Sequence, residues 1–162
     1  MNRPSNKNRP TGKKSTVPTE DDWGDYRADL EMKDAHDFFA GRTNEEMQPH
    51  FRRNPLSRRD DLLFMPEVPF RYYMLGYRDF VMAGSFDEGW APSVASCFMN
   101  LILAKLEQRP QYILPIMPDL LPTIEHVARN QAAFGDEEEI YGNFLEKGRR
   151  IRSLYADLAD SK

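Results

Sequence analysis

Apolar residues recur at helical spacing along most of the chain and are densest between residues 66 and 106. In residues 69–83 they follow one another at steps of three and four, which places them on one face of a helix. In residues 92–108 a broader apolar stripe continues with few charges. Turn residues separate the two segments, so the pattern predicts a buried helical hairpin at the centre of the fold.

Further helices are predicted on both sides of this hairpin. We expect a first helix over residues 20–40 and a second one that opens with the capping-box sequence Thr43 to Glu46. A helix is expected over residues 118–133. A last helix is expected from residue 136, with an apolar seam broken by one lysine and formed by Ile140, Phe144, Lys147, Ile151, Leu154 and Leu158.

These patterns together predict an all-α fold. No run of alternating apolar and polar residues is long enough to predict a sheet, although short strands around residues 62–68 remain an alternative. We therefore expect a single-domain helical bundle of five or six main helices around the central apolar hairpin. The chain of 162 residues is long enough to bury a substantial core.

The first 19 residues differ in composition from the rest. They contain five basic residues, no acidic residue and no aromatic one, a composition that cannot bury enough apolar surface to fold. We predict a disordered basic tail over residues 1–19 and a single helical domain over residues 20–162. Without the tail, 17 basic residues face 26 acidic ones, a net charge of −9. The predicted domain is strongly acidic.

Composition also limits the cellular setting. The single cysteine, Cys97, excludes an internal disulfide and a cysteine-rich zinc site. The sequence after Met1 has no apolar leader, so we expect a cytoplasmic protein. The apolar run at residues 91–104 is about 14 residues long, whereas a helix needs about 20 to cross a bilayer, and no membrane partner is expected.

The sequence offers little catalytic chemistry. Cys97 lies on the apolar stripe, where a cysteine usually acts as a small hydrophobic residue. The three histidines, His36, His50 and His126, have neither the HExxH nor the Glu-x-x-His spacing of metal sites. No glycine-rich phosphate loop and no GxSxG sequence is present. We therefore predict no catalytic residue, no metal ligand and no cofactor.

Two groups of basic residues are candidate anion-binding sites. The first contains Arg52, Arg53, Arg58 and Arg59, and the second contains Lys147, Arg149, Arg150 and Arg152. Phosphate groups would bind to such clusters. However, Asp60 and Asp61 follow the first group directly, and Glu146 can pair with Arg150 one helical turn away. Internal ion pairs are the interpretation that we favour.

The strongest functional indication is the charge of residues 20–40, where eight acidic residues face two basic ones, a net charge of −6. A solvated surface is the simpler interpretation. The functional one is a docking surface for a basic partner, with Asp25, Asp29 and Glu31 aligned along the outer side of the predicted helix. A small acidic protein-binding module without catalysis is therefore our hypothesis, of the physical type of inhibitors and immunity proteins that cover basic surfaces.

Two alternatives belong to other functional classes. A nucleic-acid-associated protein would use the basic tail and the arginine clusters, but the acidic domain makes a nucleic-acid partner the weaker expectation. A small-ligand-binding or enzymatic helical domain would use an aromatic pocket, for which the candidate lining residues are Tyr72, Tyr73, Tyr77 and Trp90.

Overall fold

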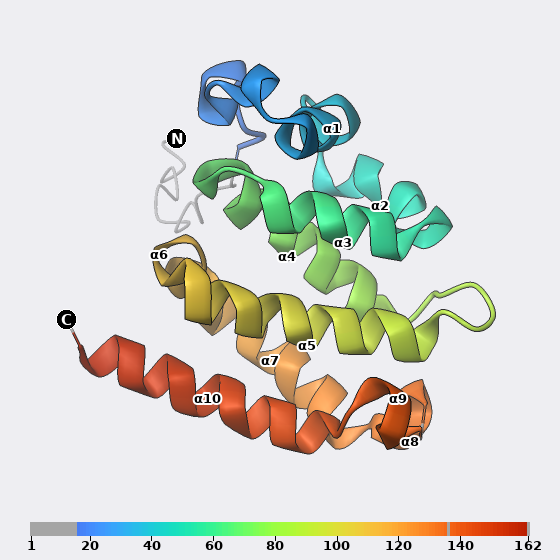
Figure 1. Ribbon diagram of the computed structural model, residues 1–162. Coiled ribbons are helices and arrows are strands. Elements are labelled where there is room, and N and C mark those ends of the chain that lie inside the picture. Colours follow the sequence, from blue (N-terminus) through green and yellow to red (C-terminus); the bar gives the residue numbers. More distant parts are fainter. Residues whose placement is uncertain (1–15, 136, 162) are drawn as a thin grey trace, which may run out of the picture.

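A computed structural model describes residues 16–135 and 137–161, and within these ranges the chain is built from helices without a strand (Figure 1). The all-α prediction is confirmed. The alternative of strands around residues 62–68 is wrong, because these residues end one helix and begin the next. The elements are η1 (Glu20–Trp23), η2 (Tyr26–Ala28), α1 (Leu30–Phe39), α2 (Asn44–Arg53), α3 (Pro55–Phe64), α4 (Glu67–Ala83), α5 (Ala91–Gln108), α6 (Pro110–Ile113), η3 (Leu114–Ile116), α7 (Met117–Arg129), α8 (Gln131–Phe134), α9 (Glu138–Tyr141) and α10 (Phe144–Asp160), where η marks a 3-10 turn.

The two helices of the predicted hairpin, α4 and α5, begin and end within two residues of the expected positions. Gly84 ends α4 in the left-handed conformation, with φ of 70°, which glycine adopts at little cost. The two helices cross (Figure 1) and touch through the rings of Tyr77 and Phe98, whose centroids lie 6.3 Å apart. α4 packs mainly on α2 and α7, and α5 packs mainly on α10 and α3. Their neighbours therefore hold the pair in place more than their mutual contact does.

Aromatic side chains from α1, α2 and α4 form one half of the core. The rings of Phe39, Phe51 and Tyr73 are fully buried, and Phe39 lies 5.9 Å from Phe51 and 4.8 Å from Tyr73 between centroids. The hydroxyl oxygen of Tyr73 lies 2.6 Å from the backbone oxygen of Phe39 and 2.8 Å from that of Arg42, and the two acceptors share its single hydrogen. A buried hydroxyl needs such a partner. These bonds tie the end of α1 to α4.

Gly76, which lies inside α4, lets α2 approach α4 closely. A Cβ atom at this position would lie only 2.2 Å from Oδ1 of Asn44. Nδ2 of Asn44 donates to the backbone oxygen of Tyr72 at 2.9 Å, and Nε2 of Gln48 donates to that of Gly76 at 3.0 Å. The absence of a side chain at Gly76 therefore allows two inter-helix hydrogen bonds.

The predicted helix over residues 20–40 is wrong in its first half. Residues 20–28 form the turns η1 and η2, which Gly24 separates with φ of 59°, and α1 begins only at Leu30. The carboxylate of Asp29 caps α1, because Oδ1 accepts from the backbone N–H groups of Glu31 at 2.9 Å and Met32 at 3.0 Å. A helix that is capped at this residue cannot extend toward Glu20.

The predicted last helix is broken into two. Gly142, with φ of 81°, separates α9 from α10, and the side chain of Asn143 caps α10 by accepting from the N–H of Glu146 at 2.9 Å. Phe144 and Ile151 are buried as predicted. Ile140 is exposed, because the break removes it from the seam. The helix expected over residues 118–133 is likewise divided, into α7 and α8.

Most of the predicted tail lies outside the described residues, since only residues 16–19 of it are described. Val17 packs partly buried against the core and Pro18 is buried. Thr19 forms a capping box with Asp22 at the start of η1. Among the described residues, Val17 and Pro18 therefore already pack against the domain, and the predicted boundary at residue 20 stays a prediction.

Candidate functional site

A cleft of about 510 Å³ lies between α1 and α3, and we call it the acidic cleft. Its lining residues are Glu31, Asp34, Asp37 and Phe38 of α1 with Ser57, Arg58, Asp60, Asp61 and Phe64 of α3. Residues three or four apart in a helix share one side, so both sets of spacings turn their side chains toward the same cleft. Five carboxylates thus converge from two helices.

Asp61 and Arg58 form the buried wall of this cleft, and each is only 9% exposed. Nε of Arg58 lies 3.0 Å from Oδ2 of Asp61, but its N–H is not directed at that oxygen, so the contact is an ion pair without a hydrogen bond. Burial raises the pKa of Asp61 to about 6, although Arg58 opposes the shift. Oδ2 of Asp61 has no hydrogen-bond donor among the described residues.

Two aromatic rings give the acidic cleft an apolar component. Phe38 is 37% exposed and Phe64 is 40% exposed, which is unusual for side chains of this size. The guanidinium carbon of Arg58 lies 3.2 Å from the centroid of the Phe38 ring. Carboxylates beside exposed aromatic faces are the groups that bind guanidinium and ammonium ions.

The three predicted partner-binding residues do not lie along one helix. Glu31 lines the acidic cleft. Asp25 precedes η2, and Asp29 is used as the cap of α1. The expected alignment is wrong because α1 begins later than predicted, while the partner-binding role itself stays a prediction. Of the five carboxylates of the acidic cleft, the sequence analysis predicted only Glu31 as a site residue. The two others on α1 could have been found, because a helix capped by Asp29 places residues 31, 34 and 37 on one side.

One of the acidic residues before α1, Glu20, is engaged in contacts within the domain. The carboxylate of Glu20 accepts from the hydroxyl of Tyr26 at 2.9 Å and contacts Nε2 of His36 at 2.8 Å. The hydrogen bonds to His36 and Tyr26 hold the pKa of Glu20 below its usual value. The ring of His36 stacks on Tyr26 with centroids 3.6 Å apart. Glu20 therefore fixes η1 and η2 to α1, away from the acidic cleft.

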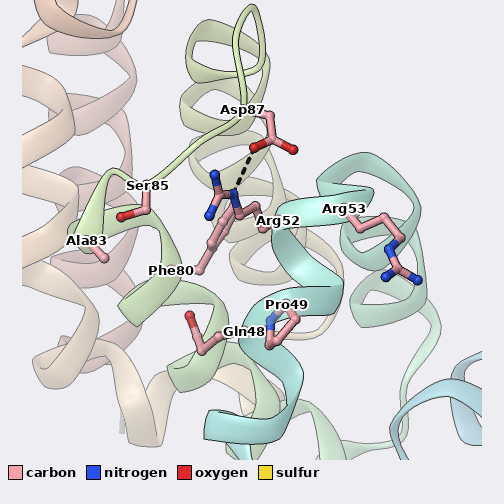
Figure 2. A pocket seen from close by; sticks show the side chains of 8 residues that line it. All are labelled: Gln48, Pro49, Arg52, Arg53, Phe80, Ala83, Ser85 and Asp87. Atoms are coloured by element: carbon pink, nitrogen blue, oxygen red, sulfur yellow. Dashed lines mark hydrogen bonds and ion pairs between the residues drawn. The ribbon is translucent and has the colours of Figure 1, made fainter.

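The first arginine group is divided between two places. Figure 2 shows Arg52 and Arg53 at a second cleft of about 580 Å³, where Nε of Arg52 lies 2.8 Å from Oδ1 of Asp87 and Arg53 points away from this pair. Its other lining residues are Gln48, Pro49, Phe80, Ala83 and Ser85. On α3, Arg58 pairs with Asp61, and Nε of Arg59 lies 2.9 Å from Oδ1 of Asp60. The preferred interpretation, internal ion pairs, is confirmed for three of the four arginines.

The second basic group is also dispersed. Arg150 pairs with Glu107 of α5 and Arg152 with Glu125 of α7, so the expected pair of Arg150 with Glu146 is wrong. These pairs form because α10 packs on both α5 and α7. Nζ of Lys147 turns inward and donates to the backbone oxygen of Tyr141 at 2.7 Å. That bond explains the lysine within the apolar seam.

The four residues of the expected aromatic pocket serve mainly as packing residues. Tyr73 and Tyr77 are fully buried in the core, and the hydroxyl of Tyr72 accepts from the backbone N–H of Asn44 at 3.3 Å. Trp90 is partly buried at the start of α5. Cys97 is half-buried, and burial raises the pKa of its thiol, which disfavours the reactive thiolate.

The two clefts thus differ in charge: five carboxylates line the acidic cleft, whereas two arginines, one carboxylate and otherwise uncharged side chains line the second cleft. Within residues 16–135 and 137–161, no three histidine, cysteine or acidic side chains are arranged to hold a metal ion.

Comparison with protein-family models, with curated proteins and with solved structures gave no match. In the part of the chain that the structure describes, no helix is both long and apolar enough to cross a membrane.

The shifted pKa of Asp61 predicts a pH dependence of stability. The folded chain takes up a proton at Asp61 near pH 6, whereas the unfolded chain takes it up near the ordinary pKa of 3.8. Folding therefore binds this proton between the two values, and the contribution of Asp61 to stability rises as the pH falls from 7 to 4. We expect a gain of up to about 2–3 kcal/mol relative to Asp61→Asn over this range, since one pKa unit equals about 1.4 kcal/mol.

Urea unfolding of both proteins at pH 7, 6, 5 and 4 measures this difference. Taking the difference between parent and variant removes the contribution of the other carboxylates, which titrate in both proteins. Parallel stability curves for the two proteins would show that Asp61 titrates alike in the folded and unfolded states.

Proposed function

We propose that this protein is a non-catalytic protein-binding module whose acidic cleft receives an arginine or lysine side chain from a basic segment of a partner. The observation that carries the proposal is the convergence of five carboxylates and two exposed phenylalanine rings on one cleft between α1 and α3. Among the lining residues, only Arg58 carries a positive charge. Beside the cleft, Lys33 pairs with Asp37 and Arg59 pairs with Asp60, so five carboxylates meet three cations and a smaller excess of negative charge remains.

Arg58 supplies an internal example of the binding mode. Its guanidinium lies over the ring of Phe38 while its Nε contacts the carboxylate of Asp61. A partner's guanidinium would use the same two kinds of group, the exposed ring of Phe64 and the carboxylates of α1 and α3. Arginine suits this site better than lysine, because its planar group both stacks on rings and binds carboxylates in pairs.

The charges of the cleft would act more on the rate of association than on affinity. Each exposed ion pair contributes about 0.2–1 kcal/mol, so the rings and the buried wall would supply most of the binding energy. Complementary charge raises the association rate and makes it dependent on salt. The scaffold of five or six main helices, the cytoplasmic location and the inhibitor-like or immunity-like role remain parts of this proposal.

The net negative charge of the domain is the reason to prefer this function over nucleic-acid binding, because either partner would have to displace internal ion pairs, such as that of Arg59 with Asp60. A phosphate would have to displace Asp87 from Arg52 and Asp60 from Arg59. Each displacement removes an existing favourable contact, and the negative domain repels the polyanion as a whole.

A defined basic peptide can stand in for the partner and test the proposal directly. We expect a hexa-arginine peptide to bind the parent protein at low salt and to shift the amide NMR signals of α1 and α3. In the triple variant Asp34→Asn, Asp37→Asn and Asp60→Asn, the affinity should fall by about tenfold or more, which corresponds to about 1.4 kcal/mol. Hexa-glutamate should not bind either protein.

The control is a second triple variant with the same change in net charge at a distant acidic stretch, Glu137→Gln, Glu138→Gln and Glu139→Gln. It should bind hexa-arginine as the parent does. Equal weakening in both triple variants would mean that the peptide responds only to net charge. That result, or NMR shifts that avoid α1 and α3, would rule out the acidic cleft as the docking site.

A further inference from the structure

Lys105, near the end of α5, is a buried cation with few partners. Its side chain belongs to a residue only 4% exposed, and Nζ donates to the backbone oxygen of Leu63 at 2.8 Å. Nζ also lies 4.7 Å from the ring centroid of Phe70 and 5.1 Å from that of Tyr112. Among the described residues, the other two N–H groups of this ammonium have no hydrogen-bond acceptor, and no carboxylate pairs with it.

Lys105 lines a cavity of about 370 Å³, which we call the cationic cavity. Its lining residues are Met32, Leu63, Phe64, Met65, Pro66, Lys105, Gln108, Arg109 and Tyr112, with no carboxylate among them. Arg109 directly follows the last residue of α5, and its side chain lines this cavity together with that of Lys105. In a domain with an excess of acidic residues, two cations without a lining carboxylate are a notable local concentration of positive charge. The volume is within the range of small-molecule sites.

The charge of the cationic cavity suits a monoanion. The C-terminal ends of α3 and α5 meet at this cavity, since Leu63, Phe64 and Gln108 belong to their last turns. Each of these two C-terminal ends contributes about −0.5 of a charge, and the N-terminal end of α4, whose N-cap Pro66 lines the cavity, contributes about +0.5. The two cations therefore leave a net positive charge, most of which one carboxylate would offset. Burial, with a smaller effect of the neighbouring Arg109, lowers the pKa of Lys105 to about 8, as expected for an ammonium that lacks a counter-ion.

We propose that the cationic cavity binds a small carboxylic acid with an apolar body. The carboxylate would lie against Lys105 and Arg109, and the apolar body would lie against the side chains of Met32, Met65 and Tyr112. A phosphate ester suits the cavity less well. It is a dianion, and the lining has no serine or threonine hydroxyl. The N-terminus of α4 reaches the lining only through Pro66, which has no N–H group to donate to a phosphate oxygen. This site takes a different ligand from the proposed partner-binding function, and the two sites share the side chain of Phe64.

The first experiment compares 3-phenylpropanoate with its uncharged amide, 3-phenylpropanamide. Titrations are followed on methionine methyl groups labelled with ¹³C, because Met32 and Met65 line the cavity. We expect the acid to shift both signals and to bind about tenfold more tightly than the amide. Equal affinities of the acid and the amide, or shifts confined to other methionines, would overturn the proposal.

The second experiment assigns the preference to the two cations. Lys105→Met keeps the buried volume, and Arg109→Gln changes an exposed residue. In each variant the ratio of the affinity for the acid to the affinity for the amide should fall to nearly one. Arg149→Gln, a control at an exposed residue of α10, should leave it unchanged. If Lys105→Met does not fold, Arg109→Gln alone decides, and an unchanged preference in it would overturn the site. Tighter binding of phenyl phosphate than of the acid would overturn the ligand class.

Discussion

Phe144→Ala is expected to lower the free energy of unfolding by about 3–5 kcal/mol, the usual loss for a phenylalanine that leaves a cavity. Phe144 is the first residue of α10 and is fully buried, and a short loop at Gly142 and Asn143 leads into it. Its backbone N–H donates to Oε1 of Gln131 at 2.9 Å, and the substitution leaves that bond in place. The expected loss is therefore a packing loss, measured by urea unfolding.

The next residue provides the matched control. Leu145 occupies the same turn of α10 but is 44% exposed, so Leu145→Ala should change stability by less than about 1 kcal/mol. A domain of this size is stable by about 5–15 kcal/mol, so Phe144→Ala removes a large part of that margin. A loss at Phe144 no greater than at Leu145 would mean that the N-terminal end of α10 is not anchored in the core.

Gly76→Ala is expected to destabilise the protein by about 2–3 kcal/mol, although alanine favours a helix by about 1 kcal/mol relative to glycine. The new Cβ would lie 2.2 Å from Oδ1 and 2.9 Å from Cβ of Asn44, so the side chain or α2 must move. Either movement disrupts the bond from Asn44 to the backbone oxygen of Tyr72. The midpoint of urea unfolding measures the effect.

A double-mutant cycle separates this collision from other effects of the substitution. Asn44→Ala removes Oδ1 and Cγ, the two closest atoms, and leaves only the Cβ contact at 2.9 Å, so Gly76→Ala should be less harmful in its presence. If both backgrounds lose the same stability, the collision with Asn44 is not the cause. If Gly76→Ala is stabilising, α2 and α4 can separate without loss, and their close approach contributes nothing.

The sequence predicted correctly those helices whose apolar spacing and capping residues all lie within the helix or at its ends. The apolar spacing of residues 69–83 and 92–108 predicted α4 and α5, and the Thr43 capping box predicted the start of α2, where Oγ1 accepts from the N–H of Glu46. The failures occurred where two local signals compete. Asp29 and Gly142 interrupt segments whose apolar spacing continues across them, and the interrupting residue prevailed in both cases.

The candidate sites depend on contacts between helices that no local pattern contains. The acidic character of residues 20–40 indicated negative charge but not its location, because Asp60 and Asp61 come from α3 and complete the acidic cleft. In the sequence, nothing distinguishes Lys105 from other lysines. Its special environment arises because Leu63 of α3, Tyr112 of α6 and Phe70 near the start of α4 surround its ammonium group. Sequence reasoning therefore predicted charge and helices, and packing determined where the charges meet.

Phe64, at the end of α3, lines both the acidic cleft and the cationic cavity. Two binding equilibria are thermodynamically linked when both ligands fix the position of the same side chain. A carboxylic acid that fixes the ring in one position would change the affinity for a basic partner, and by reciprocity the partner would change the affinity for the acid by the same factor. A single ring, 40% exposed, would thus let a small anion modulate the recognition of a cationic protein.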